Sequence, residues 1–191
     1  MFEKEFERLG GVSPLESTEF DGLSDEDIRE IEDRIGKSLP DDYKKFLQQY
    51  GEVLFNKSVG FKPVDKHALY QHDTEVGLPN PEFSGSQVSV FFGKGSDYPS
   101  SLMAKLEVYD GRMPESVMPI ADDGLGNKIC IGIGSTNHGK VYWWDHHNEW
   151  DEDDYEDEIG VEMPEEAKFQ NLYLLAPSFT KFLKKLFVVA D

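Results

Sequence analysis

The chain has 191 residues, of which 38% are hydrophobic and 30% charged, and these values fit one domain with one core of ordinary size. Asp and Glu number 38 against 19 Lys and Arg, which gives a formal net charge of -19. A charge of this sign repels nucleic acid and anionic membrane surfaces, so we expect neither as a ligand, whereas it attracts basic proteins.

The beginning of the sequence and its cysteine content indicate a cytoplasmic protein. Residues 1–10 are too rich in charge for a secretory signal, and no run approaches the roughly 18 apolar residues that span a bilayer. Cys130 is the single cysteine, which excludes an intrachain disulfide and a thiolate zinc cluster. We expect residues 1–20 to form an N-terminal arm or helix and residues 21–191 to form the domain.

Two amphipathic helices are predicted next along the chain. The first has Ser24 as N-cap and Gly36 as its end, and the second opens at Pro40 and ends at Gly51. Their apolar faces consist of Ile28, Ile31 and Ile35 in the first helix and of Tyr43, Phe46, Leu47 and Tyr50 in the second.

After Gly51 the pattern changes to short apolar runs typical of strands. The predicted strands are Val53–Phe55, Val59–Phe61, Val88–Phe92, Val117–Ile120, Ile129–Ile133 and Val141–Trp144. We expect the last three to form a meander because their connections are too short for crossover helices. With a short helix over 100–110, an irregular excursion over 62–86 and a helix opening at Pro177, this is an α+β fold. It is a single domain with a mostly antiparallel sheet of about six strands flanked by N-terminal and C-terminal helices.

Residues 124–148 form the most informative stretch, because they read as a β-hairpin with an aromatic edge. Isoleucines alternate with Cys130 and Gly132 in the first strand, and Val141 and Trp143 continue the same core-facing pattern in the second. If Val141 and Trp143 follow the isoleucines into the core, Tyr142 and Trp144 project outward. For Trp144 and Trp150, a role in partner binding and packing under the acidic run are both open. Residues 149–158 contain eight acidic residues in ten positions and are expected to be a solvated loop.

Two motifs and a closing segment together resemble a known family. Residues 28–51, I-x-x-I-E-x-x-x-G-x-x-L-P-x-x-Y-x-x-F-L-x-x-Y-G, resemble the N-terminal signature of the SUKH superfamily. Residues 119–144 resemble its central hairpin and residues 176–183 its closing helix, so the resemblance covers about residues 23–187. This chain departs from many members at Glu52, where they carry a second glycine, and at Asn127, where they carry aspartate; both positions fall on turns.

The resemblance implies a binding role of one of two kinds. Members of the bacterial immunity branch stay in the cytoplasm and neutralise a cognate toxin, often a nuclease or another basic enzyme domain. Fungal members of the Smi/Knr type are regulatory interaction proteins of cell-wall (glucan) synthesis. The resemblance leaves both branches open.

Three histidines and a carboxylate lie close together in sequence at the end of the hairpin, as the ligands of a metal site would. Asp145, His146 and His147, with His138 nearby, are residue types that bind metals. On a strand, however, Asp145 and His147 share one face and His146 takes the other, so we expect an ordinary polar strand end and no metal.

Catalytic and cofactor motifs are also weak. Residues 134–140, GSTNHGK, are close to a phosphate-binding loop, but Val141 replaces the required Ser or Thr and a strand follows, so a hairpin turn is expected. No nucleophile elbow or H-E-x-x-H motif occurs, and Cys130 has no evident base. We therefore expect neither an enzyme nor a bound cofactor.

The acidic run and the neighbouring aromatics are the predicted partner-binding surface. The candidate residues are Tyr142, Trp144, Asp145, Trp150, Asp151, Glu152, Asp153, Asp154 and Tyr155, with Asp122 and Asp123 from the preceding turn. The carboxylates are expected to steer a basic partner and stand in for substrate phosphates, and the aromatics to supply contact area. Taken with the resemblance to the SUKH superfamily, these features lead us to expect a monomeric immunity protein that occludes a basic toxin domain; a regulatory scaffold is the alternative.

Overall fold

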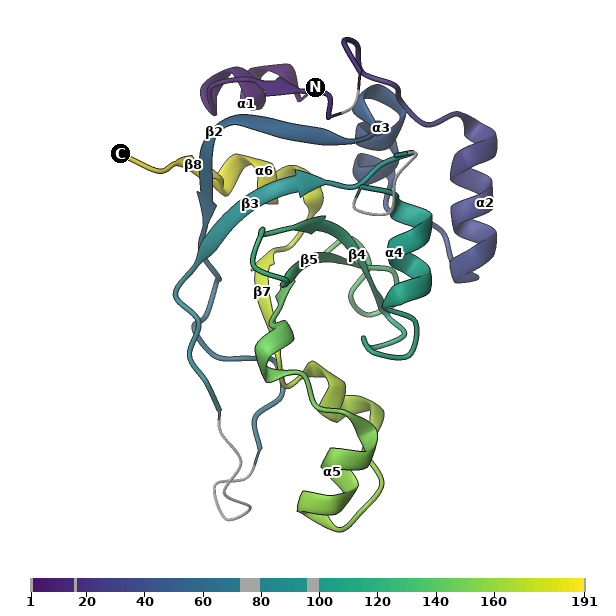
Figure 1. The fold of residues 1–191 in the computed structure, drawn as a ribbon, viewed down its shortest axis with the longest axis vertical. Coiled ribbons are helices and arrows are strands. Elements are labelled where there is room, and N and C mark those ends of the chain that lie inside the picture. Colours follow the sequence, from purple (N-terminus) through teal and green to yellow (C-terminus); the bar gives the residue numbers. More distant parts are fainter. Residues whose placement is uncertain (1, 16, 73–79, 96–99, 191) are drawn as a thin grey trace.

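A curved sheet forms the centre of the molecule (Figure 1). The structure, a computed structural model, describes residues 2–15, 17–72, 80–95 and 100–190. The strands are β1 (Val12–Ser13), β2 (Val53–Phe61), β3 (Ser86–Phe91), β4 (Val117–Asp122), β5 (Lys128–Gly132), β6 (Val141–Trp144), β7 (Leu172–Ala176) and β8 (Phe187–Val188). They follow the order β1 to β7 across the sheet, β8 also pairs with β2, and every pairing between these strands is antiparallel.

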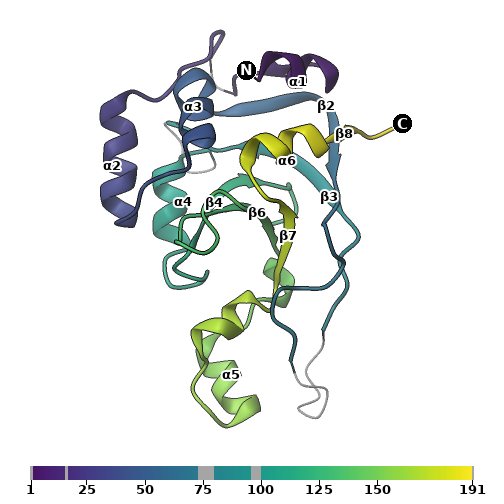
Figure 2. The same cartoon turned by 180° about the vertical axis from the view of Figure 1, so that it is seen from behind.

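Helices from both ends of the chain surround this sheet (Figures 1 and 2). The α-helices are α1 (Glu3–Arg8), α2 (Asp25–Ile35), α3 (Asp41–Tyr50), α4 (Leu102–Val108), α5 (Glu152–Ile159) and α6 (Phe179–Lys185), and the short 3₁₀ helices are η1 (His146–Asn148) and η2 (Glu165–Phe169). The predicted α+β fold and the helices near residues 24, 40 and 100 are confirmed. The last helix begins at Phe179 instead of Pro177, because the Ser178 hydroxyl accepts from the Lys181 amide and caps it.

Local capping explains why α2 begins and ends where the sequence predicts. The Ser24 hydroxyl accepts a hydrogen bond from the Asp27 amide, and the Asp27 carboxylate accepts from the Ser24 amide at 2.8 Å. Gly36 adopts a left-handed conformation at the other end, where a side chain would be strained. Ile28 and Ile31 are buried against the core, so caps and apolar spacing agree on one helix.

The sheet is buried on both faces over β4 to β7, and this differs from the one-faced hairpin that the sequence predicted. The first core includes the hairpin residues Ile129, Ile131 and Trp143 and the apolar faces of the helices. A second core covers the opposite face and consists of Met113, Val117, Cys130, Tyr142, Trp144 and Leu172. The chain after α4 and the chain around η2 supply this cover, so both side-chain rows of β5 and β6 are buried.

The acidic run is a helix, and the prediction of a solvated loop is wrong. Asp151 caps α5 by accepting from the Asp153 amide at 2.9 Å, and acidic residues in a first turn are stabilised by the helix dipole. Tyr155 is buried and Gly160 ends the helix in a left-handed conformation. These local signals outweigh repulsion between adjacent carboxylates.

The sheet has more strands than the six runs predicted. The two runs at 53–61 merge into β2, with a register irregularity between Leu54 and Val59. β7 was missed because its run is apolar throughout, which follows from burial on both faces. The meander of β4, β5 and β6 and the turn over 134–140 are confirmed.

β2 and β7 are each covered on their outer side by other segments. β1 pairs with residues 54–55 of β2 and β8 pairs with residues 59–60, so segments from opposite ends of the sequence share one edge. At the other edge, the carbonyls of Leu172 and Leu174 in β7 accept hydrogen bonds from the amides of Leu69 and Val64.

The N-terminal segment and the excursion complete the fold. Residues 1–20 contain α1, and Phe2 and Phe6 pack into the first core, so this helix shares the core of the domain. The described part of residues 62–86 contains only an isolated bridge between His67 and Glu82 before β3 begins, as the predicted excursion requires; residues 73–79 lie outside the described residues.

Candidate partner-binding surface

Asp123 organises the turn between β4 and β5. Its carboxylate is buried and accepts hydrogen bonds from the backbone amide and, at 2.8 Å, the side-chain amide of Asn127. The Trp143 indole donates to it at 3.3 Å and the Ser86 hydroxyl at 3.1 Å. A buried carboxylate needs such donors, so this predicted partner-binding residue is committed to the fold.

Asp122 is paired with a buried cation. Its carboxylate lies 2.8 Å from the Lys128 ammonium, whose side chain is 3% exposed, and the ammonium also lies over the Tyr109 ring at 5.2 Å. Burial opposes the charge of Lys128, but hydrogen bonds with Asp122 and Tyr109 outweigh burial and raise the pKa of the ammonium. Asp122 is therefore neutralised within the molecule and offers a partner little net charge.

Tyr142 and Trp144 are buried, and the prediction that they project outward is wrong. Their exposed fractions are 3% and 0%, and both belong to the second core with Met113 and Leu172. Segments outside the hairpin cover this face of the sheet and form the second core, and the alternation within the hairpin does not reveal that cover. Neither ring offers contact area to a partner.

Arg112 closes the second core from outside. Its guanidinium forms two hydrogen bonds to the Glu149 carboxylate, at 2.8 and 2.6 Å, and lies 4.9 Å from the Tyr109 ring and 5.6 Å from the Trp144 ring. Forked pairing and stacking on rings are the two geometries that arginine favours. No local pattern in the sequence indicates this site, because the partners lie up to 37 residues apart.

Asp145 caps a short helix. Its carboxylate accepts from the His147 amide at 3.0 Å and from the Asn148 side chain at 2.6 Å, which fixes η1. His146 stacks on the Trp144 ring at 5.8 Å, and His138 lies at 3.1 Å from the Ser38 carbonyl. Within the residues that the structure describes, no group of three or more His, Cys, Asp or Glu side chains is placed to hold a metal ion.

The remaining predicted residues lie in a projecting element that we call the acidic lobe, residues 149–166. Eleven of its eighteen residues are Asp or Glu and none is Lys or Arg. Figures 1 and 2 show its helix α5 standing away from the end of the sheet. Asp151, Glu152, Asp153 and Asp154 are exposed, and so are 156–158. The lobe is therefore a concentrated, accessible negative charge.

The aromatic residues of the lobe attach it to the body. Tyr155 is 4% exposed, and its ring lies 6.1 Å from the His72 ring and 6.2 Å from the Trp150 ring. Lys168 in η2 pairs with Glu152 at 3.0 Å. Burial opposes the charge of Lys168, but its contacts with Glu152 and Glu165 outweigh burial and raise its pKa. Tyr155 is thus an anchor, and Trp150, which is half-buried, is the one predicted aromatic that remains partly accessible.

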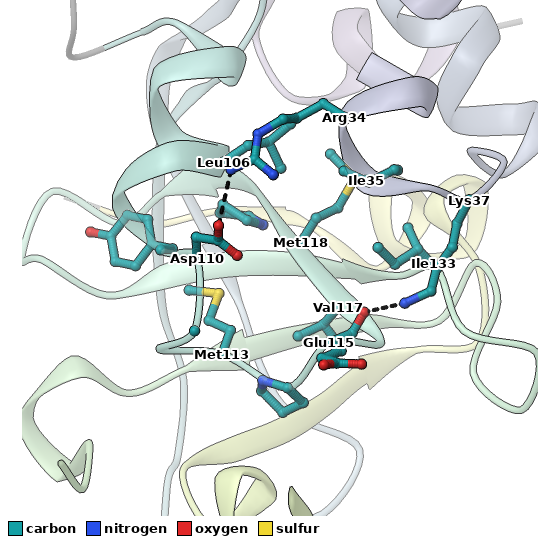
Figure 3. A pocket seen from close by; sticks show the side chains of 14 residues that line it. Arg34, Ile35, Lys37, Leu106, Asp110, Met113, Glu115, Val117, Met118 and Ile133 are labelled. Carbon is teal, nitrogen blue, oxygen red and sulfur yellow. Dashed lines mark hydrogen bonds and ion pairs between the residues drawn. The ribbon is translucent and has the colours of Figure 1, made fainter. Parts of the chain in front are cut away.

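A pocket of about 250 Å³ opens between the end of α2 and the loop that follows α4 (Figure 3). Its walls come from the end of α2, the end of α4, the loop over 109–116 that follows α4, and the strands below. Its apolar lining includes Ile35, Leu106, Met113, Val117, Met118 and Ile133. Figure 3 shows two bridges across it: the Arg34 guanidinium meets Asp110 at 3.0 Å, and the Lys37 ammonium donates to the Glu115 carbonyl.

Comparison with known proteins supports the resemblance seen in the sequence. The profile of the SMI1 / KNR4 family (SUKH-1) matches residues 22–185. The chain belongs to this family. The match extends from the residues just before α2 to the end of α6, so the SMI1 / KNR4 region includes the acidic lobe and the pocket, while α1, β1 and β8 fall outside it.

A relative of this SMI1 / KNR4 chain occurs in Bacillus subtilis (strain 168), where it is described as the SPbeta prophage-derived uncharacterized protein YokK. It is 30% identical over 132 residues, which cover 64% of this chain and 62% of the relative, so the chain spans less than two thirds of that protein's length. In the described part of this chain, no helix is long and apolar enough to cross a membrane.

Proposed function

We propose that this chain is a non-enzymatic immunity-type protein of the cytoplasm that binds a basic toxin domain and blocks it by occlusion. The observation that carries the proposal is the acidic lobe, which contains eleven carboxylates and no basic side chain and whose helix α5 stands away from the sheet in Figure 1. Such a field accelerates encounter with a basic partner to about 10⁸ M⁻¹s⁻¹ at low salt. We expect the carboxylates of the lobe to stand in for the phosphates that a nuclease partner binds.

The family match and the relative support this role. Membership in the SMI1 / KNR4 family (SUKH-1) is compatible with immunity or regulation. The relative is described as prophage-derived, and this origin suits a protein inherited together with the toxin that it neutralises.

The chemistry of the single thiol fits binding better than catalysis. Cys130 is fully buried in the second core, and burial raises the pKa of its thiol well above the ordinary value. A nucleophilic cysteine needs a lowered pKa and access to substrate. Cys130 therefore serves packing.

The test pairs this chain with basic toxin domains encoded in the genome of its source. Each toxin domain is induced in a sensitive host with and without the chain, and survival is measured. For a toxin that the chain neutralises, association kinetics are then recorded with purified proteins over a range of salt. We expect survival, 1:1 stoichiometry and a nanomolar or lower dissociation constant. The binding free energy is then about 4 kcal/mol more favourable than that of a scaffold that binds its partners with micromolar affinity.

Two variants that each lose five negative charges locate the surface that binds the toxin domain. The lobe variant carries D153N, D154N, E156Q, D157N and E158Q, which spares the cap Asp151 and the pair of Glu152. The matched control carries E19Q, D21N, E26Q, E30Q and D33N, at exposed positions before and along α2. The lobe variant should associate at least about tenfold more slowly with a flattened salt dependence, and the control should not. If the two variants associate at equal rates, the lobe is not the binding surface. If the chain binds several partners with micromolar affinity and does not restore survival, the regulatory scaffold is favoured.

A further inference from the structure

A protein interface needs an apolar centre as well as charges that attract the partner. Because Tyr142, Trp144 and Tyr155 are buried, they do not supply that centre. Binding energy concentrates in a few desolvated apolar anchors near the middle of an interface. We propose that the pocket between α2 and the 109–116 loop receives one apolar side chain, of leucine or phenylalanine size, from a basic segment of the partner. This inference rests on the proposed function and adds the site of its main anchor.

The lining of the pocket suits a side chain better than a metabolite. Ile35, Leu106 and Met118 face the cavity in Figure 3, together with Met113 and Ile133. Its volume of about 250 Å³ lies below the roughly 300–1,000 Å³ of small-molecule sites. Methionines are flexible and polarizable, so they adapt to an inserted group.

The bridges across the pocket do not hold it shut. In the ion pair between Arg34 and Asp110 the side chains are 42% and 68% exposed, so the pair is weak in water. The bond from Lys37 to the Glu115 carbonyl is also exposed. Each bridge pairs a cation with an oxygen, and the four charged side chains of the lining, two cationic and two anionic, cancel. A neutral side chain therefore fits the pocket, and the charge preference of the interface comes from the lobe.

The pocket and the lobe form one continuous surface. The Glu115 amide donates to the Glu165 carboxylate at 2.9 Å, and the Lys168 ammonium donates to the Gly111 carbonyl at 3.2 Å. Gly111 lines the pocket and also a second groove, of about 300 Å³, whose other wall is residues 149–153 of the lobe. A chain segment lying along the lobe therefore reaches the pocket mouth, and complementarity to the lobe requires that segment to be basic.

The test uses methionine methyl groups as reporters in the full chain. Met113 and Met118 line the pocket, Met163 lies in the acidic lobe, and Met103 lies on α4 away from both. The ¹³C-methyl resonances, assigned by single Met→Leu substitutions, are followed during titration with the blocked peptide acetyl-Lys-Phe-Lys-amide. Acetyl-Lys-Ala-Lys-amide and acetyl-Glu-Phe-Glu-amide are the controls.

We expect the phenylalanine peptide with lysines to shift Met113 and Met118 and to bind at least about tenfold more tightly at low salt than the peptide with glutamates. The alanine peptide should shift Met163 alone. Ile35→Phe, or the larger I35W, fills the pocket from the end of α2 and should abolish the shifts of Met113 and Met118 while that of Met163 remains. Because the peptide comparison needs no variant, misfolding of I35W does not affect it.

The outcomes separate this inference from the proposed function. A shift of Met163 without shifts of Met113 and Met118 overturns the pocket as an anchor site and leaves the role of the lobe intact. Shifts at the pocket of equal size for the basic and acidic peptides overturn the link between pocket and lobe. Absence of any shift at millimolar peptide overturns the inference, while the survival assay with the toxin still decides the proposed function on its own.

Discussion

Two acidic segments that look alike in the sequence, the turn at 122–123 and the acidic lobe, have different fates in the fold. Asp122 pairs with Lys128, and Asp123 is surrounded by donors that include Trp143. The lobe supplies no cation of its own, and α5 keeps most of its carboxylates exposed. The comparison teaches that a carboxylate is available to a partner only where the fold has not already assigned it a donor.

Removing the Asp122 carboxylate is the strongest test of this difference. Asp122→Ala leaves the Lys128 ammonium buried without its partner, which should lower the free energy of unfolding by about 3–5 kcal/mol. Urea unfolding followed by tryptophan fluorescence measures the change. Replacing both partners, with K128M added to the first substitution, should recover most of the loss; a single variant as stable as the original chain means that the pair is not buried.

Truncating the anchor of the lobe should have a smaller and local effect. Tyr155→Ala removes the ring that packs near His72 and Trp150, at a cost of about 3 kcal/mol. Hydrogen exchange should accelerate in residues 151–160 while α2 and the sheet stay protected. Uniform acceleration across the chain would show that the lobe unfolds with the body and is no separate element.

Alkaline pH should weaken the ion pair of the turn at 122–123. The pKa of Lys128 is raised above its ordinary value of 10.5 in the folded state, so its ion pair contributes fully below that pH and is lost as pH rises through the folded value. The free energy of unfolding of the original chain should therefore fall above about pH 10.5 more steeply than that of K128M. Parallel curves for the two proteins contradict the raised pKa.

Neutralising the lobe should change stability least and in the opposite direction. Relief of like-charge repulsion along α5 should exceed the loss of the two first-turn charges, Asp153 and Asp154, and stabilise the five-residue lobe variant by about 1 kcal/mol at low salt. Thermal unfolding at low and high salt measures the effect, which should disappear as salt screens the charges. A loss of stability would mean that these carboxylates have structural partners, as those of the turn do.

Local signals allowed much of the fold to be predicted from the sequence. The caps at Ser24 and Gly36 and the spacing of apolar residues define α2 within a few residues of chain, and the short turns define the meander. The same reasoning failed for Trp144, because the cover of its face comes from Tyr109 and Met113, which lie far away along the chain. The pocket was missed for the same reason, since α2, the 109–116 loop and β4 meet only in the folded protein.

The way in which β2 and β7 are covered bears on aggregation. β2 is shielded by β1 and β8, and the carbonyls of β7 are occupied by the amides of Val64 and Leu69. An open strand edge is a template on which further chains add and form fibrils. Here, most of the backbone that would nucleate such growth is already paired, and the net charge of -19 keeps copies apart. We therefore expect the fold to resist edge-to-edge association while keeping its charged lobe exposed.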